Sequence, residues 1–97
     1  MTEQTLSTRV REDICRLARA HGLTKVILVG SRARGDCHRT SDIDLAVLGG
    51  NTAAFSLDVE EDTWTLLRFD VVDLARPMQA ALRESIEKEG VIIYEKV

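Results

Sequence analysis

Residues 25–48 read KVILVGSRARGDCHRTSDIDLAVL, and this stretch decides the expected fold. Its apolar start, residues 25–29, predicts a strand that is buried on both faces and therefore central in its sheet. Residues 42–48 alternate between polar and apolar at their start and predict a second strand. The polar loop between the two strands is too short for a crossover helix, so we expect them to be antiparallel neighbours.

Helices are expected before and after this pair of strands. Near the N-terminus, apolar residues recur at spacings of three and four, which predicts a helix, and Gly22 follows where a helix commonly ends. After the second strand, residues 51–63 are expected to contain a short helix with Phe55 and Val59 facing inward.

The C-terminal third of the chain supplies two more strands and one more helix. Residues 66–72 predict the third strand and residues 91–94 the fourth. Pro77 is expected at the first position of the helix between them, where its missing N–H costs nothing. We therefore expect an α/β (α+β) fold in which a small mixed β-sheet is flanked by helices.

Composition limits the kind of protein this is. With 97 residues, of which 44% are hydrophobic, residues 1–97 are expected to form a single domain. A net charge of −3 and an aromatic content of 4% argue against direct nucleic-acid binding. Apolar stretches are too short to span a membrane, and the first residues lack the apolar core of a signal peptide, so a cytoplasmic location is expected. The two cysteines, Cys15 and Cys37, are too few for a disulfide scaffold.

The turn after the first strand has the composition of an anion site. Free backbone N–H groups in such a turn bind anions, and Gly30 lets the backbone approach a phosphate closely. Ser31 adds a hydroxyl donor, while Arg32 and Arg34 add guanidinium groups that match phosphate oxygens. Taken alone, the same residues also fit an ordinary turn with solvated arginines.

Three aspartates interrupt the predicted strands. Asp42 and Asp44 project from one face of the second strand, where like charges repel and a divalent cation such as Mg²⁺ would relieve the conflict. Asp70 interrupts the third strand and can face the same cleft if the two strands are neighbours. Three carboxylates can hold two metal ions about 3.5–4 Å apart for phosphoryl-type transfer. The alternative is an edge strand that faces solvent.

These residues carry a resemblance to a known family. Gly30-Ser31, ten further residues and then Asp42-Ile43-Asp44 resemble the signature of the DNA polymerase β-like nucleotidyltransferase superfamily. The longer pattern GSRARG followed by SDIDLAV is similar to its minimal nucleotidyltransferase branch, the MntA-type antitoxins. The resemblance implies the polymerase β-like nucleotidyltransferase fold, with ATP as the nucleotide donor.

The resemblance also implies roles for individual residues. Gly30 and Ser31 would hold the triphosphate, and Arg34 would reach a phosphate that is not transferred. The metal ligands would be Asp42 and Asp44, which bind both Mg²⁺ ions, and Asp70, which binds the catalytic ion and helps to deprotonate the attacking hydroxyl. Arg32 has no equally clear counterpart in the family and is retained as a candidate for phosphate binding.

The function implied by the resemblance is a Mg²⁺-dependent transfer of AMP from ATP to a protein hydroxyl. The expected acceptor is a tyrosine of a HEPN-type toxin or a related four-helix bundle, so that the chain would act as the antitoxin of a toxin–antitoxin pair. Larger family members carry a further domain that binds the nucleobase and the acceptor substrate. Here we expect a partner to close the site, in a hetero-oligomer or a homodimer.

Two other functions remain open at this point. The chain could be a non-catalytic antitoxin that occludes a helical partner, or half of a split small-molecule nucleotidyltransferase that resembles aminoglycoside-modifying enzymes. All three aspartates are present, which favours an enzyme, but the sequence does not separate a protein acceptor from a small molecule. Residues 91–94 and the surroundings of Trp64 are the expected contact surfaces for a partner.

Overall fold

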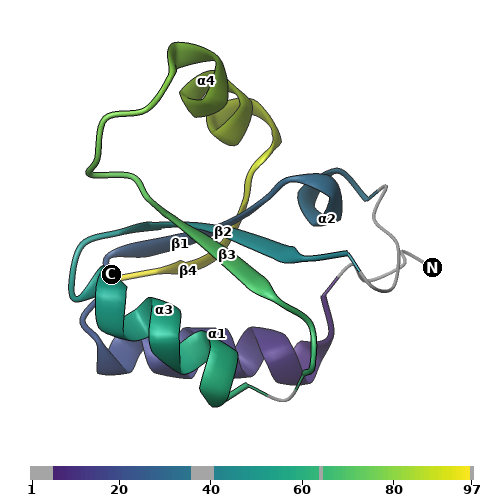
Figure 1. The fold of residues 1–97 in the computed structure, drawn as a ribbon, viewed down its shortest axis with the longest axis vertical. Helices are drawn as coiled ribbons and strands as arrows, with labels where there is room; N and C mark the ends of the chain where they lie inside the picture. Colours follow the sequence, from purple (N-terminus) through teal and green to yellow (C-terminus); the bar gives the residue numbers. More distant parts are fainter. Residues whose placement is uncertain (1–5, 36–40, 64, 97) are drawn as a thin grey trace.

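The computed structural model describes residues 6–35, 41–63 and 65–96, and its four strands form one sheet with helices packed around it (Figure 1). Along the chain the elements are α1 (Thr8–Ala20), β1 (Lys25–Val29), α2 (Ser31–Arg34), β2 (Ile43–Leu48), α3 (Thr52–Glu61), β3 (Phe69–Asp73), α4 (Ala80–Glu89) and β4 (Val91–Glu95). The predicted order of elements and the α/β fold with a mixed sheet are confirmed. Among the described residues, no helix is both long and apolar enough to cross a membrane.

β1 lies in the interior of the sheet, whose strand order is β3-β2-β1-β4. It pairs antiparallel with β2 and with β4, whereas β2 and β3 are parallel, so the predicted central strand and its antiparallel neighbour are confirmed. Val29 lies opposite Asp44 in the first pair, and Asp44 lies opposite Asp70 in the parallel pair. This register brings the end of β1 next to the starts of β2 and β3.

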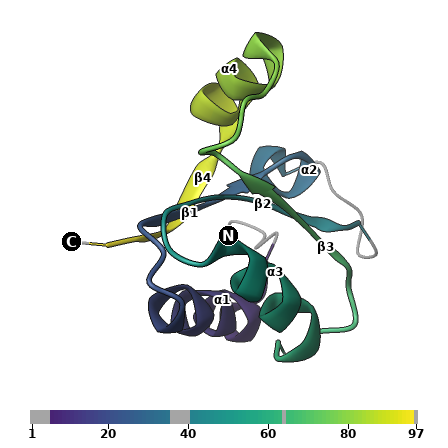
Figure 2. The ribbon, with the colours of Figure 1, turned by 60° about the vertical axis from the view of Figure 1, so that its left-hand side comes forward.

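The hydrophobic core lies on one face of the sheet, which α1 and α3 cover (Figure 2). Ile43, Leu45 and Val47 of β2 are completely buried, in agreement with the predicted period of two. Phe55 and Val59 of α3 are completely buried as well, which confirms the predicted inward face of that helix. Removing these side chains from water supplies the main driving force for the fold.

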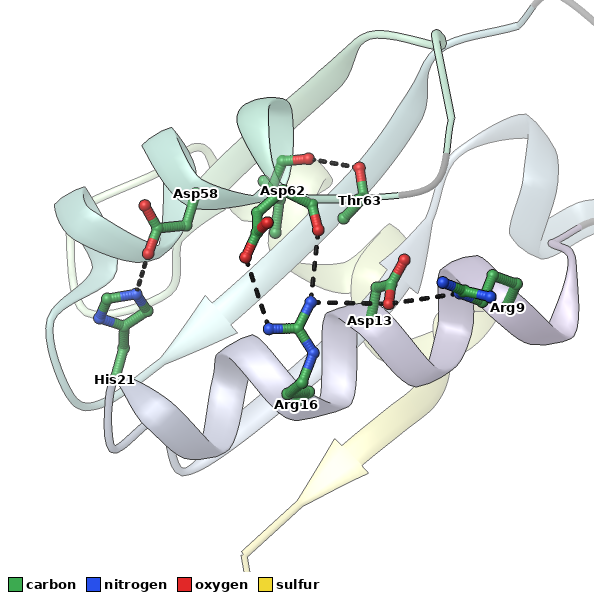
Figure 3. Close-up of polar contacts among 8 residues, drawn as sticks. Arg9, Asp13, Arg16, His21, Asp58, Asp62 and Thr63 are labelled. Atoms are coloured by element: carbon green, nitrogen blue, oxygen red, sulfur yellow. Dashed lines mark hydrogen bonds and ion pairs between the residues drawn. The ribbon is translucent and has the colours of Figure 1, made fainter.

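Polar contacts also join the two helices under the sheet (Figure 3). Nε2 of His21, the residue that ends α1, lies 2.6 Å from Oδ2 of Asp58 in α3. Nearer the middle of α1, Nη1 of Arg16 lies 3.4 Å from Oδ2 of Asp62. Ser7 caps the start of α1 by accepting a hydrogen bond from the Val10 amide. The contacts of His21 and Arg16 join α1 to the α3 segment beneath the strands that carry the site.

α4 lies on the other side of the sheet, away from α1 and α3 (Figure 1). Ile86 is its buried residue, and Gly90 directly after the helix packs so closely on the sheet that a Cβ there would lie 2.5 Å from Cγ2 of Ile27. Leu82, one turn before Ile86, is 44% exposed. The helix is therefore anchored mainly at its C-terminal end.

Two predicted boundaries, the starts of β3 and of α4, are each wrong by about three residues. β3 begins at Phe69 and not at Leu66, whose side chain is fully exposed to solvent. α4 begins at Ala80, so Pro77 lies before the helix instead of at its first position. The carboxylate of Asp73 accepts a hydrogen bond from the backbone two residues later, which makes a turn after β3. The chain is then still extended at Gln79 (φ −62°, ψ 142°) and cannot start a helix at the proline.

Candidate active site

Three strand ends place the predicted site residues at one edge of the sheet. β1 runs toward this edge and leads into Gly30 and Ser31, while β2 and β3, which are parallel to each other, start from it. Asp42 lies directly before β2, Asp44 is the second residue of that strand, and Asp70 is the second residue of β3. The topology therefore brings the glycine–serine turn and the three aspartates together from segments as much as 40 residues apart.

Gly30 lies against the carboxylate of Asp44. A Cβ built on Gly30 would lie 2.5 Å from Oδ2 of Asp44, and the backbone at Gly30 has φ +74°. Only glycine combines this φ with so close an approach. The sequence explained Gly30 by the approach of a phosphate, and the structure adds a second reason, which is that the Asp44 side chain needs the space.

The aspartates affect one another electrostatically. Asp44 is partly buried, and this burial is the main cause that raises its pKa above the ordinary value of 3.8. The charges of Asp70, its neighbour across the β2–β3 pair, and of Asp42 raise the pKa further, whereas the Arg32 guanidinium lowers it. The repulsion expected from the sequence thus acts on Asp44.

This set of side chains fits a hard divalent cation. Mg²⁺ prefers oxygen ligands and is commonly bound by one or two carboxylates together with substrate phosphates. Asp44 and Asp70 offer carboxylates from adjacent positions on neighbouring strands, and Asp42 adds a third within electrostatic reach. In the parts of the chain that the structure describes, no three acidic, histidine or cysteine side chains are close enough to hold a metal ion by themselves.

The two arginines of the turn lie in different surroundings. Arg32 is buried, and its Nε and Nη2 donate hydrogen bonds of 3.2 and 2.7 Å to the carbonyl oxygen of Ser41. Arg34 is about half exposed, and its Nη1 lies 3.4 Å from Oε2 of Glu89 at the end of α4. Of the two guanidinium groups, that of Arg34 is therefore the more accessible from solvent.

Sequence analysis missed Glu89 and the backbone of Arg68. The Arg68 carbonyl accepts a hydrogen bond of 2.8 Å from the Ile43 amide and so fixes the chain next to Asp42. Glu89 contacts Arg34, which lies 55 residues earlier in the sequence, and no local sequence pattern indicates that contact. Of the expected contact surfaces, Ile92 is 48% exposed, while Trp64 lies outside the described residues.

Comparison with known proteins identifies the family to which this chain is similar. A family model described as polymerase beta, nucleotidyltransferase matches residues 12–97. No match was found among the curated proteins. A solved structure described as a minimal nucleotidyltransferase is 32% identical, with a TM-score of 0.65 over 84% of this chain and 86% of that one.

Two toxin–antitoxin structures also have the same fold. One, crystallised with AMP-PNP, is 26% identical, with a TM-score of 0.72 over 89% of this chain and 73% of that one. The other, MntA-HpeT, is 23% identical, with a TM-score of 0.70 over the same shares, and shows the fold alone. Since the family model matches residues 12–97, which is most of the chain, the chain belongs to the polymerase beta nucleotidyltransferase family.

Proposed function

We propose that this protein transfers AMP from ATP to a tyrosine hydroxyl of a helical, HEPN-type partner toxin and thereby acts as its antitoxin. The observation that carries the proposal is the position of Asp44, which lies against Gly30 of the phosphate-type turn and directly opposite Asp70 on the next strand. Membership in the family supports a nucleotidyltransferase. The similar toxin–antitoxin structure with AMP-PNP supports an adenine nucleotide and a protein partner.

The turn after β1 would hold the triphosphate. In the described part of the chain, no hydrogen bond engages the amide or the hydroxyl of Ser31, so both donors can serve phosphate oxygens. Gly30 keeps the backbone free of a side chain at this point. Arg34 would exchange its exposed contact with Glu89 for a phosphate that is not transferred, because a guanidinium fork binds phosphate oxygens well.

The proposed step is a direct in-line displacement. The tyrosine oxygen attacks the α-phosphorus of ATP, the bond from this phosphorus to the bridging oxygen breaks, and pyrophosphate leaves. Asp70, which is exposed at the start of β3, accepts the proton of the hydroxyl. Mg²⁺ bound by Asp42, Asp44 and Asp70 would neutralise the charge that develops on the phosphate oxygens.

The test uses both proteins. The purified chain is incubated with the protein encoded by the adjacent gene, ATP and Mg²⁺, and the partner is weighed by mass spectrometry. We expect the added mass of one or more AMP groups, located on tyrosine by peptide mapping and absent with Asp42→Ala. An unmodified partner that is nonetheless bound and inhibited would contradict the transfer and favour an occluding antitoxin.

A further inference from the structure

The guanidinium of Arg32 is committed to a backbone contact. Arg32 is 7% exposed, although arginine is almost never buried unless it is paired. Two of its nitrogens, Nε and Nη2, donate to the same acceptor, the carbonyl oxygen of Ser41, at 3.2 and 2.7 Å. Burial of a cation is costly without such hydrogen bonds, so this side chain is held in one place by the fold.

The contact acts on the residue that follows Ser41. A carbonyl and the next amide belong to one rigid, planar peptide group, so fixing the Ser41 oxygen fixes the plane that leads into Asp42. On the other side of Asp42, the Ile43 amide donates a hydrogen bond of 2.8 Å to the carbonyl oxygen of Arg68. Both peptide groups that flank Asp42 are therefore held, although this aspartate lies outside β2 and is exposed.

We infer that Arg32 is a positioning residue of the site: it holds the peptide between Ser41 and Asp42 and so presents the Asp42 carboxylate beside Asp44. The inference rests on the proposed function, in which these carboxylates bind the metal. It gives Arg32 a role different from that of a triphosphate ligand. Arg32 lies in α2, and Ser41 lies just before β2. The contact between them therefore also links the phosphate turn to the segment that carries Asp42.

Two binding measurements separate a positioning role from a phosphate contact. The first is the affinity of ATP in EDTA, and the second is the affinity of Mn²⁺ in the presence of AMP-PNP, both by isothermal titration. Loss of a group that orients a metal ligand commonly costs about 10–100-fold in metal affinity. We expect Arg32→Met to weaken Mn²⁺ binding to this extent and to leave ATP binding in EDTA within about twofold.

Two further variants complete the experiment. Arg32→Lys keeps the charge and one donor, so we expect it to recover part of the Mn²⁺ affinity, and it preserves the test if Arg32→Met fails to fold. Arg83→Met is the matched control, because Arg83 also donates to a backbone carbonyl, that of Leu74, on the exposed side of α4. We expect Arg83→Met to leave both affinities unchanged.

The outcomes distinguish the two proposals. If Arg32→Met weakens ATP binding in EDTA as much as it weakens Mn²⁺ binding, Arg32 is a phosphate ligand and the inference is overturned. Unchanged Mn²⁺ affinity in both Arg32 variants overturns it as well. A wild-type protein that binds Mn²⁺ and AMP-PNP but never transfers AMP to the partner overturns the proposed function and leaves the placement of Asp42 by Arg32 supported by the binding data.

Discussion

Asp44 carries a carboxylate whose ionised form the folded protein disfavours. Burial is the main cause that raises its pKa above 3.8, and the charges of Asp70 and Asp42 add to it. The folded protein therefore binds this proton more tightly than the unfolded chain does. As a result, the contribution of Asp44 to the free energy of unfolding falls as pH rises from 3.8 through the raised pKa, and at neutral pH the ionised group destabilises the metal-free protein.

Asp44→Asn should raise the melting temperature of the metal-free protein at neutral pH, because the amide removes the buried charge and its repulsion. It should also flatten the fall in stability over the pH interval above 3.8, while AMP transfer is lost. Thermal unfolding followed by circular dichroism across this interval gives both results. Glu60→Gln, which removes an exposed carboxylate from α3, is the control for the loss of a negative charge. A lower melting temperature for Asp44→Asn would mean that the carboxylate stabilises the fold.

Gly30→Ala should damage the site by a steric effect on Asp44. The new Cβ would lie 2.5 Å from Oδ2 of Asp44, so the carboxylate has to move, and alanine at φ +74° and ψ −154° adds strain of about 1–3 kcal/mol. Gly22→Ala is the matched control, since Gly22 has φ +68° and no described atom within 4 Å of the new Cβ. Urea unfolding should show a loss of stability in both variants, and only Gly30→Ala should lose AMP transfer. Equal transfer by the two variants would contradict the role of this close approach.

At the scale of elements, α4 reaches the site through its C-terminal end. Glu89, the last residue of the helix, contacts Arg34 of α2, and the two side chains are 43% and 45% exposed. If Arg34 binds a phosphate, Glu89 competes with the nucleotide for it. An exposed ion pair contributes about 0.2–1 kcal/mol, so the competition is weak but measurable.

Glu89→Gln should strengthen the binding of ATP with Mg²⁺ by at most about fivefold, because Arg34 no longer exchanges one partner for another. Isothermal titration measures the change. Glu84→Gln removes the same charge from α4, but Glu84 pairs with Lys88 on the same helix and should leave the affinity unchanged. Equal gains in the two variants would indicate a general effect of net charge instead of a contact with Arg34.

How far the elements could be predicted depends on whether their cause is local. The apolar run of β1, the alternation of β2 and the inward spacing of Phe55 and Val59 are properties of neighbouring residues, and all three predictions are confirmed. The start of α4 was misplaced because the turn made by Asp73 competes with the preference of Pro77 for a first helical turn. Local preference is a weak guide where a side chain offers the backbone another hydrogen bond.

The site was predictable in its residue types but not in all its contacts. The spacing from Gly30 to Asp44 predicted that the turn lies next to this aspartate, because antiparallel pairing brings the two ends of that segment together. Two contacts arise only when distant segments pack, namely that of Arg34 with Glu89 and that between the amide of Ile43 and the carbonyl of Arg68. Neither has a signal within a short window of sequence.

At the scale of the whole molecule, the strand order converts separate segments into one binding edge. β2 lies between β1 and β3, and the register places the end of β1 next to the starts of β2 and β3. A ligand that contacts the turn and the aspartates at once therefore holds the ends of three strands together. Such a ligand binds the folded protein and not the unfolded chain, so its binding free energy is added to the stability of the fold.

ATP with Mg²⁺ should accordingly raise the melting temperature far more than either component alone. At about 100 times its dissociation constant, a ligand adds about 2.7 kcal/mol, which corresponds to about 10–20 °C in a domain of this size. ATP in EDTA should give a much smaller shift, because the phosphates then meet three carboxylates whose charge is not neutralised. The variant with both Asp44→Asn and Asp70→Asn serves as the control and should respond equally to ATP with and without Mg²⁺. If the wild-type protein also showed equal shifts in EDTA and in Mg²⁺, the aspartates would not bind a metal together with the nucleotide, and the proposed chemistry would have to be abandoned.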